Sequence, residues 1–132
     1  MTAVADTRLL FVTEFPSNLE ERQKIKDFLD KEIRNRLLAP TVILAEFVEI
    51  AGARIGQEAA KNRIRQLKER GMEIMPLDEE HALMTGSLLL SNRKVPLADA
   101  IIASYVKNGE ADYVITDDPN YKTLNIKTKW IP

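Results

Sequence analysis

Four carboxylates are spread along the whole chain, each beside an apolar stretch: Asp6, Glu46, Asp99 and Asp118. Each lies at or near a junction between a predicted strand and a predicted helix. In an α/β fold, the carboxyl ends of parallel strands and the starts of the following helices converge on one edge, where binding sites form. Clustered carboxylates repel one another unless a cation neutralises them. The four acids therefore predict a site for a hard divalent cation such as Mg²⁺ or Mn²⁺.

Asp6 and Glu46, considered one at a time, lead to different structural expectations. Asp6 follows an apolar strand and is also explained as the N-cap of the next helix. Glu46 has Val42, Ile43 and Ile50 as its helical neighbours, so it lies on an apolar face. An unpaired carboxylate is costly there, and Glu46 needs a cation, a hydrogen-bonding partner or a position at the rim.

The other two acids also have structural explanations. Asp99 lies in the first turn or so of a predicted helix, where the helix dipole favours a negative charge. Asp117 and Asp118 follow the predicted strand Tyr113–Ile115, and acids before Pro119 are common in turns. The prediction of a metal site therefore depends on all four acids together.

The composition limits the other kinds of site. The 132 residues contain no cysteine and one histidine, His81, which excludes disulfides, thiolate metal sites and a multi-histidine zinc site. The formal net charge is −1, so the chain is not a globally basic nucleic-acid binder. A polyanionic partner would have to meet a local basic patch.

The chain reads as one domain over residues 1–132, with the 45% hydrophobic and 30% charged residues of a globular protein. No apolar run approaches the roughly 20 residues of a membrane helix, and we expect no signal peptide at the start. These features, with the absence of cysteine, suggest a cytoplasmic protein.

Predicted strands and helices alternate along the chain, which favours a mostly parallel sheet with helices on both faces. Strands are predicted at Ala3–Ala5, Leu37–Pro40, Glu73–Met75, Tyr113–Ile115 and near Lys127–Ile131. The first predicted helix begins at Leu9 and ends before Pro16, and the second begins at a capping box, Ser17–Glu20. The third runs from an N-cap at Thr41 to Ile55. The remaining predicted helices are Gln57–Arg70, Asp78–Leu90 and Pro96–Asn108. Thr116–Tyr121 is predicted to be a polar turn, and the last strand an edge strand. The expected architecture is a three-layer α/β/α sandwich.

The segments around the four acids resemble the PIN-domain family, especially the small VapC-type toxin ribonucleases of prokaryotes. These segments are Val4–Thr7, Pro40–Glu46, Leu97–Ala103 and Val114–Tyr121. The third resembles the family's Leu-Ala-Asp-Ala-x-Ile-Ala helix, and the fourth its Val-x-Thr-x-Asp-x-x-Phe segment. Each segment is short and unspecific alone, but the four in order at family-like spacing are specific.

The resemblance implies a PIN fold, and it implies that Asp6, Glu46, Asp99 and Asp118 are the catalytic acids that hold Mg²⁺ or Mn²⁺. Thr116 would support them with its hydroxyl, and Asp117 would be a supporting residue at a position that varies in the family. The implied activity is metal-dependent hydrolysis of RNA phosphodiesters by the toxin of a type II toxin–antitoxin pair. A cognate antitoxin protein and a homodimer are the implied protein partners.

Two residues depart from the family pattern. Arg8 stands where the family usually has a small polar residue, and Tyr121 stands in place of the more common Phe. Arg8 has four possible roles: binding a substrate phosphate, pairing with an acid, contacting the antitoxin, or lying solvated at a helix start. Lys122 flanks the last motif and is a second candidate for RNA binding.

Two other functions remain open on the sequence. One is a PIN-like binding or scaffold module in which the acids are only vestigial. The other is a receiver-type phosphoacceptor domain. The receiver reading is disfavoured, because the first strand ends in a single Asp and no Asp follows the third strand at Met75.

Overall fold

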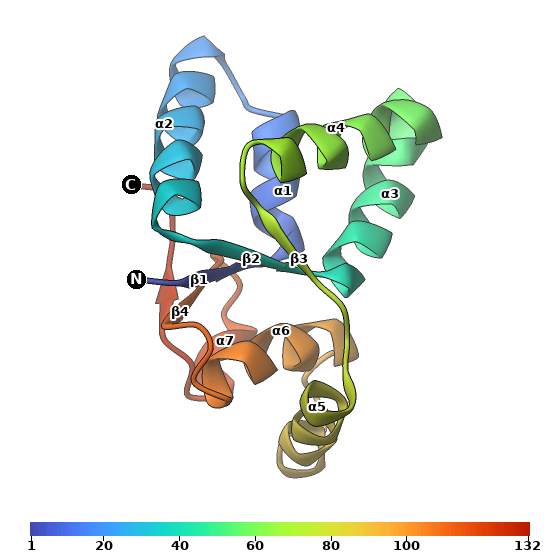
Figure 1. Ribbon diagram of the computed structural model, residues 1–132, viewed down its shortest axis with the longest axis vertical. Coiled ribbons are helices and arrows are strands. Elements are labelled where there is room, and N and C mark those ends of the chain that lie inside the picture. The colour runs from blue at the N-terminus through green and yellow to red at the C-terminus, as the bar shows by residue number, and fades with distance from the viewer.

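A computed structural model describes residues 1–132 and contains one sheet of five strands (Figure 1). The strands are β1 (Ala3–Ala5), β2 (Leu37–Pro40), β3 (Glu73–Met75), β4 (Tyr113–Ile115) and β5 (Thr128–Lys129). Their spatial order is β3-β2-β1-β4-β5, and every neighbouring pair is parallel. The predicted mostly parallel sheet is confirmed.

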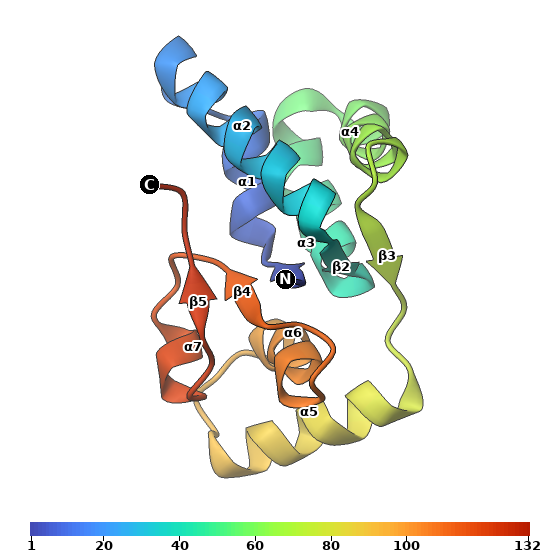
Figure 2. The ribbon, with the colours of Figure 1, turned by 60° about the vertical axis from the view of Figure 1, so that its left-hand side comes forward.

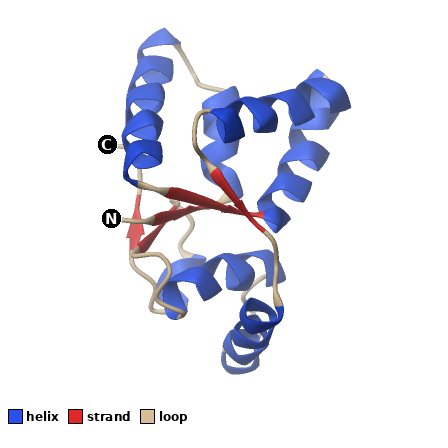
Figure 3. Ribbon diagram, viewed as in Figure 1, coloured by secondary structure: helices blue, strands red, loops and turns tan.

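Helices cover both faces of this sheet, as the three-layer prediction requires (Figures 1 and 3). The helices on one face are α1 (Thr7–Glu14), α2 (Leu19–Asn35), α3 (Thr41–Ile55) and α4 (Gln57–Glu69). Those on the other face are α5 (Glu79–Ser91), α6 (Leu97–Lys107) and α7 (Asn120–Thr123). None of the helices combines the length and the apolar composition that crossing a bilayer requires.

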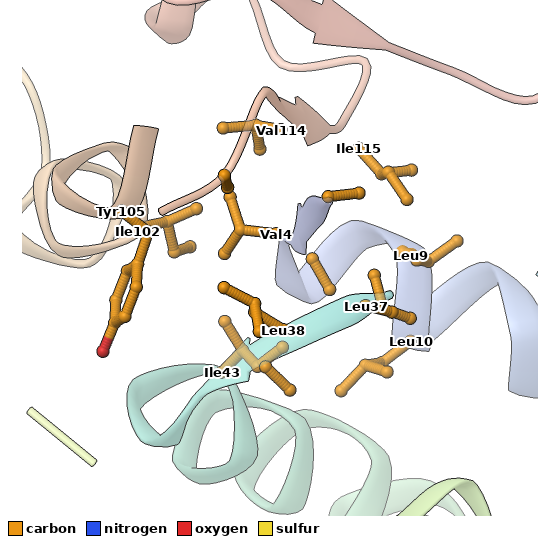
Figure 4. Close-up of a cluster of buried hydrophobic side chains, with 14 of the residues drawn as sticks. Val4, Leu9, Leu10, Leu37, Leu38, Ile43, Ile102, Tyr105, Val114 and Ile115 are labelled. Atoms are coloured by element: carbon orange, nitrogen blue, oxygen red, sulfur yellow. The ribbon is translucent and has the colours of Figure 1, made fainter. Parts of the chain in front are cut away.

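The central strands are short apolar runs because both of their faces are covered. Every residue of β1 and β2 is buried, and Val4 and Leu38 lie between the two helical layers (Figure 4). Ile102 and Tyr105 of α6 pack in the same core and are fully buried. The core therefore fixes the ends of β1 and β4, after which Asp6 and Asp118 follow, and it fixes α6, which carries Asp99.

The order of the strands reverses between β1 and β4. The chain first builds β2 and β3 on one side of β1, and then returns through α5 and α6 to place β4 on the other side. Ala5 pairs with Ile115, so Asp6 and Thr116 leave the two strands side by side. Ligands bind in α/β folds outside the carboxyl ends of the strands at such a switch point.

Four helix starts differ from prediction by one or two residues. Helix α1 begins at Thr7 and not at Leu9, because Asp6 caps it, and α6 begins at Leu97, with Pro96 as its N-cap. Ser17 was predicted to cap α2, but Asn18 does so, accepting a hydrogen bond from the Glu21 backbone N–H at 2.8 Å. Ser17 and Asn18 are both followed three residues later by Glu, so the capping pattern fits either register. Thr41 is the first residue of α3 and not its N-cap, and no side chain caps that helix.

The C-terminal region also differs from prediction. The polar turn after β4 is followed by the short helix α7, which begins at Asn120 within the predicted turn. The last strand is confined to Thr128–Lys129, shorter than predicted, and it pairs with β4 at an edge of the sheet (Figure 2).

A buried carboxylate ties α2 to this edge. Glu32 is fully buried and accepts hydrogen bonds from the Tyr113 hydroxyl at 2.7 Å and from the Lys129 ammonium at 2.6 Å. Removing one partner of a buried charged group is destabilising, because the other is left uncompensated. The residues that make this contact are far apart in the sequence, and the contact was not predicted.

Candidate metal centre

Asp6 is a helix cap and also a member of the acid group. It follows β1 and is 4% exposed. One carboxylate oxygen accepts from the Thr7 backbone N–H at 2.7 Å, and the other accepts from the Thr116 hydroxyl at 2.7 Å. Burial raises the pKa of Asp6 from its ordinary 3.8 to about 6, and the charges of Asp99 and Asp118 act in the same direction. The two hydrogen bonds oppose this rise.

Glu46 lies on α3 and has the hydrogen-bonding partner that an acid on an apolar face needs. Its Oε1 accepts from the Thr7 hydroxyl at 2.5 Å. The side chain is only half-buried, and Ile50, one turn further along α3, is 43% exposed. Glu46 therefore lies at a rim, and Thr7 links it to the start of α1, where Asp6 lies.

Asp99 lies in the first turn of α6 and is 8% exposed. Its Oδ2 accepts from the side-chain amide of Asn120 at 3.0 Å. Burial raises the pKa of Asp99, and the charges of Asp118 and Glu46 add to the rise, while the Asn120 amide opposes it. The position on the helix favours a negative charge, but burial and neighbouring acids outweigh that effect.

Asp118 is held in the segment after β4 by two local hydrogen bonds. Its backbone N–H donates to the Thr116 hydroxyl at 3.0 Å, and its Oδ1 accepts from the Asn120 backbone N–H at 2.9 Å. Since Thr116 also donates to Asp6, its hydroxyl connects the segments that follow β1 and β4. The resemblance expects a supporting hydroxyl at Thr116, and its role in a metal site stays a prediction.

All four acids line one pocket of about 300 Å³ at the switch point. The other lining residues are Thr7, Arg8, Phe11 and Ile50. No three acidic or histidine side chains in the structure lie close enough together to hold one ion. Glu46, Asp6 and Asp99 accept hydrogen bonds from Thr7, Thr116 and Asn120 respectively. Shared coordination would require them to draw together.

The chemistry of this donor set suits a hard divalent cation. The pocket offers carboxylate and hydroxyl oxygens and contains no histidine or thiolate. Oxygen ligands are those preferred by Mg²⁺, Ca²⁺ and Mn²⁺. Burial and mutual repulsion raise the pKa values of Asp6 and Asp99, and a nearby cation would oppose both effects.

Arg8 pairs with Asp117 and not with Asp6. Its Nε and Nη2 donate to the two carboxylate oxygens of Asp117, each at 2.9 Å, and this guanidinium lowers the pKa of Asp117. Arg8 still lines the acid pocket, where the charges of Asp6 and Asp118 act on it. Asp117 does not line that pocket. Lys122 lies exposed on α7 without an ion pair.

This geometry predicts the effect of Arg8→Ser. We expect a modest gain in Mg²⁺ affinity, about two- to threefold, because a competing positive charge leaves the pocket. Stability should change by less than about 1 kcal/mol, since the pair with Asp117 is exposed. Arg36→Ser is the matched control, because Arg36 pairs with Glu73 at the opposite ends of the strands and is similarly exposed. Metal titration and thermal unfolding check both effects, and unchanged or weaker Mg²⁺ binding would contradict them.

Sequence reasoning missed Asn120 of α7. Asn120 donates from its side chain to Asp99 and from its backbone to Asp118, so it positions two of the acids. Its place two residues after Asp118 is the spacing of a common side-chain turn, which was the available signal. Tyr121 is fully buried, and the charges of all four acids raise its pKa well above its usual range, after burial itself.

A protein-family model matches the part of the chain that contains the four acids. The PIN-domain family model matches residues 4–127, which include all four acids. The chain belongs to the PIN-domain family. No curated protein matches the chain.

Solved PIN-fold structures superpose over nearly the whole chain. The chain is similar to a chain of VapBC2 from Rickettsia felis bound to a promoter DNA fragment, with a TM-score of 0.79, 16% identity and 100% of both chains covered. It is also similar to a chain of DNA-bound VapBC from Salmonella typhimurium, with a TM-score of 0.79, 17% identity and coverage of 100% and 99%. VapC20 of Mycobacterium tuberculosis, described as a sarcin–ricin-loop-cleaving toxin, gives a TM-score of 0.75 at 10% identity, covering 95% of this chain and 96% of that one. At these identities the likeness establishes the fold.

Proposed function

We propose that this PIN-domain protein is a metal-dependent endoribonuclease and the toxin of a type II toxin–antitoxin pair. The observation that carries the proposal is the convergence of Asp6, Glu46, Asp99 and Asp118 on one pocket at the switch point of the sheet. Membership of the PIN family and the fold shared with VapC toxins support a toxin nuclease.

In the proposed mechanism, a divalent ion bound by the carboxylates would lower the pKa of a water molecule and stabilise charge on the leaving oxygen. The chain's own residues position the ligands. Thr116 orients Asp6, and Asn120 orients Asp99 and Asp118. Thr7 holds Glu46 at the rim. No side-chain nucleophile would be needed, since water would attack the phosphodiester.

RNA must approach an acidic pocket on a protein with a formal net charge of −1. The proposed contacts are Lys122, which is free of ion pairs, and Arg8, which would have to leave Asp117 to reach a phosphate. Each phosphate contact would contribute to a salt-dependent affinity.

We infer an antitoxin partner from the similar structures, and a homodimer only from the resemblance of the sequence to VapC-type toxins. Several similar structures are described as VapBC complexes or as a toxin–antitoxin complex. A small antitoxin reading frame beside the gene for this chain would support the pairing. We place the protein in the cytoplasm, where its RNA substrate would be found.

The direct test is cleavage of single-stranded and loop-containing RNA by purified, antitoxin-free protein. We expect cleavage with Mg²⁺ or Mn²⁺ and none in excess EDTA, with activity restored when metal is added back. Equal cleavage in EDTA would refute the metal mechanism. RNA binding without cleavage under all of these conditions would favour the alternative of a PIN-like binding or scaffold module.

A further inference from the structure

Two rows of side chains run side by side along α1 and α3, and both rows begin at the acid pocket. Residues four apart on a helix lie on the same face. With that spacing, the row of α1 and its C-cap is Thr7, Phe11 and Phe15, and the row of α3 is Glu46, Ile50 and Arg54. The two helices pack against each other in one layer (Figure 1). The two rows meet in three pairs.

These pairs differ in chemistry with distance from the acids. The first is the hydrogen bond that holds Glu46 at the rim. The second is Phe11 and Ile50, the two large apolar side chains that line the acid pocket. In the third, the guanidinium carbon of Arg54 lies 4.1 Å from the ring centre of Phe15, and it lies 5.7 Å from that of Phe11. The rows therefore lead from carboxylates, past an aromatic ring, to a cation.

Arg54 is a cation that the fold leaves free. It is exposed and takes part in no ion pair, whereas Arg8 is held by Asp117. Its place two turns after Glu46 puts it about 12 Å further along α3. The attraction between a guanidinium and the faces of aromatic rings holds Arg54 at this place. Guanidinium groups bind phosphate with charge-assisted, often paired, hydrogen bonds.

This order suits a single strand of RNA whose scissile phosphate lies at the acids. Single strands are bound by stacking their bases on aromatic side chains and by cations along the backbone. Phe11 offers a ring in the wall of the pocket, and Arg54 offers a cation beyond it. Because carboxylates and phosphates repel each other, a strand that reaches the acids needs attractive contacts outside the pocket.

We propose that Phe11 and Arg54 form a substrate track for the nucleotide next to the scissile phosphate. A base stacks on Phe11, and its flanking phosphate binds Arg54. This inference rests on the ribonuclease activity proposed above. Neither residue is among the metal-site acids, so their loss should weaken RNA binding and leave Mn²⁺ affinity unchanged. In cleavage assays, KM should rise with little change in kcat, as expected when uniform binding is lost.

The first test is Arg54→Gln, with binding of a short fluorescein-labelled single-stranded RNA of mixed sequence followed by anisotropy in EDTA. At about 0.1 M salt we expect affinity to fall about fivefold, and the slope of log affinity against log salt to decrease by about 0.7, because one phosphate contact is lost. Arg34→Gln is the matched control. Arg34 is exposed, forms no ion pair and lies in the last turn of α2, at the opposite ends of the strands. That variant should keep the wild-type affinity and slope.

The second test compares Phe11→Leu with Phe11→Tyr on the same RNA. Loss of stacking on one base weakens binding about 5- to 140-fold, so Phe11→Leu should bind at least about fivefold more weakly. Phe11→Tyr keeps a ring and should bind as the wild type does. Phe28→Leu is the packing control, since Phe28 is a buried ring under the Lys129 ammonium and lies outside the acid pocket. It should unfold at a lower temperature and keep its RNA affinity.

The inference is overturned if either Arg54→Gln or a folded Phe11→Leu binds the RNA as the wild type does, which is also the result expected of a surface that serves a protein partner. It is overturned equally if Phe11→Tyr binds as weakly as Phe11→Leu. If the wild type binds no RNA, the inference and the proposed function fail together. If the wild type binds RNA with the expected losses but does not cleave it in Mn²⁺, the track stands and only the nuclease proposal fails.

Discussion

Asp99→Asn is expected to abolish RNA cleavage while leaving the fold intact or more stable. The substitution removes a metal ligand, and the rate should fall by at least about 100-fold, since loss of outer partners alone costs roughly 10–100-fold. Stability should not fall, because burial and the charges of Asp118 and Glu46 already disfavour the ionised Asp99. Initial cleavage rates and thermal unfolding of the same preparation measure both effects.

Asp27→Asn provides the control for this experiment. Asp27 is an exposed acid on α2, where it accepts a hydrogen bond from Gln23 at 2.9 Å, and it lies outside the acid pocket. That variant should cleave RNA at the wild-type rate. Full activity of Asp99→Asn would contradict the assignment of Asp99, and an unfolded Asp99→Asn would contradict the expected stability.

The second large effect is on the pH dependence of stability. The pKa of Asp6 is about 6 in the fold and ordinarily 3.8, so the folded protein binds more protons than the unfolded chain between these values. The metal-free protein should therefore lose stability as the pH rises from about 4 to about 6, by about 3 kcal/mol from this group. The raised pKa of Asp99 acts in the same direction.

A bound divalent ion should reverse this loss, because it favours the ionised acids. We expect Mn²⁺ to raise the unfolding temperature strongly at pH 7.5 and weakly at pH 5, where protons compete with the metal for Asp6. Thermal unfolding with Mn²⁺ and with EDTA at both pH values measures the difference. An equal Mn²⁺ effect at pH 5 and pH 7.5 would be inconsistent with binding at these carboxylates.

The central strands could be predicted because each is a short apolar run next to a polar residue or proline. Ala3–Ala5, Leu37–Pro40 and Tyr113–Ile115 have the predicted bounds. The edge strand Glu73–Met75 also has its predicted bounds, although it begins with an exposed glutamate. Parallel strands covered on both faces require such runs. The alternation of strands and helices then placed the carboxyl ends of the strands at one edge, so the shared pocket of the four acids followed from local pattern and topology together.

Contacts between side chains that are remote in sequence could not be predicted in the same way. Arg8 was open to several roles, and its pairing with Asp117, 109 residues away, depends on how the segments after β1 and β4 meet. The burial of Glu32 against Tyr113 and Lys129 is of the same kind. For the same reason, the sequence showed Tyr121 only as a departure from Phe, and not that its buried hydroxyl has no hydrogen-bonding partner.

The most direct test of the central claim is a crystal structure of the protein soaked in Mn²⁺, with the ion located by its anomalous scattering. We expect a peak in the acid pocket, within about 2.0–2.3 Å of oxygens from Asp6, Asp99 and Asp118, with Glu46 bound to the ion directly or through water. A protein that cleaves RNA in Mn²⁺ but shows no peak in this pocket, or binds Mn²⁺ only elsewhere, would contradict the account.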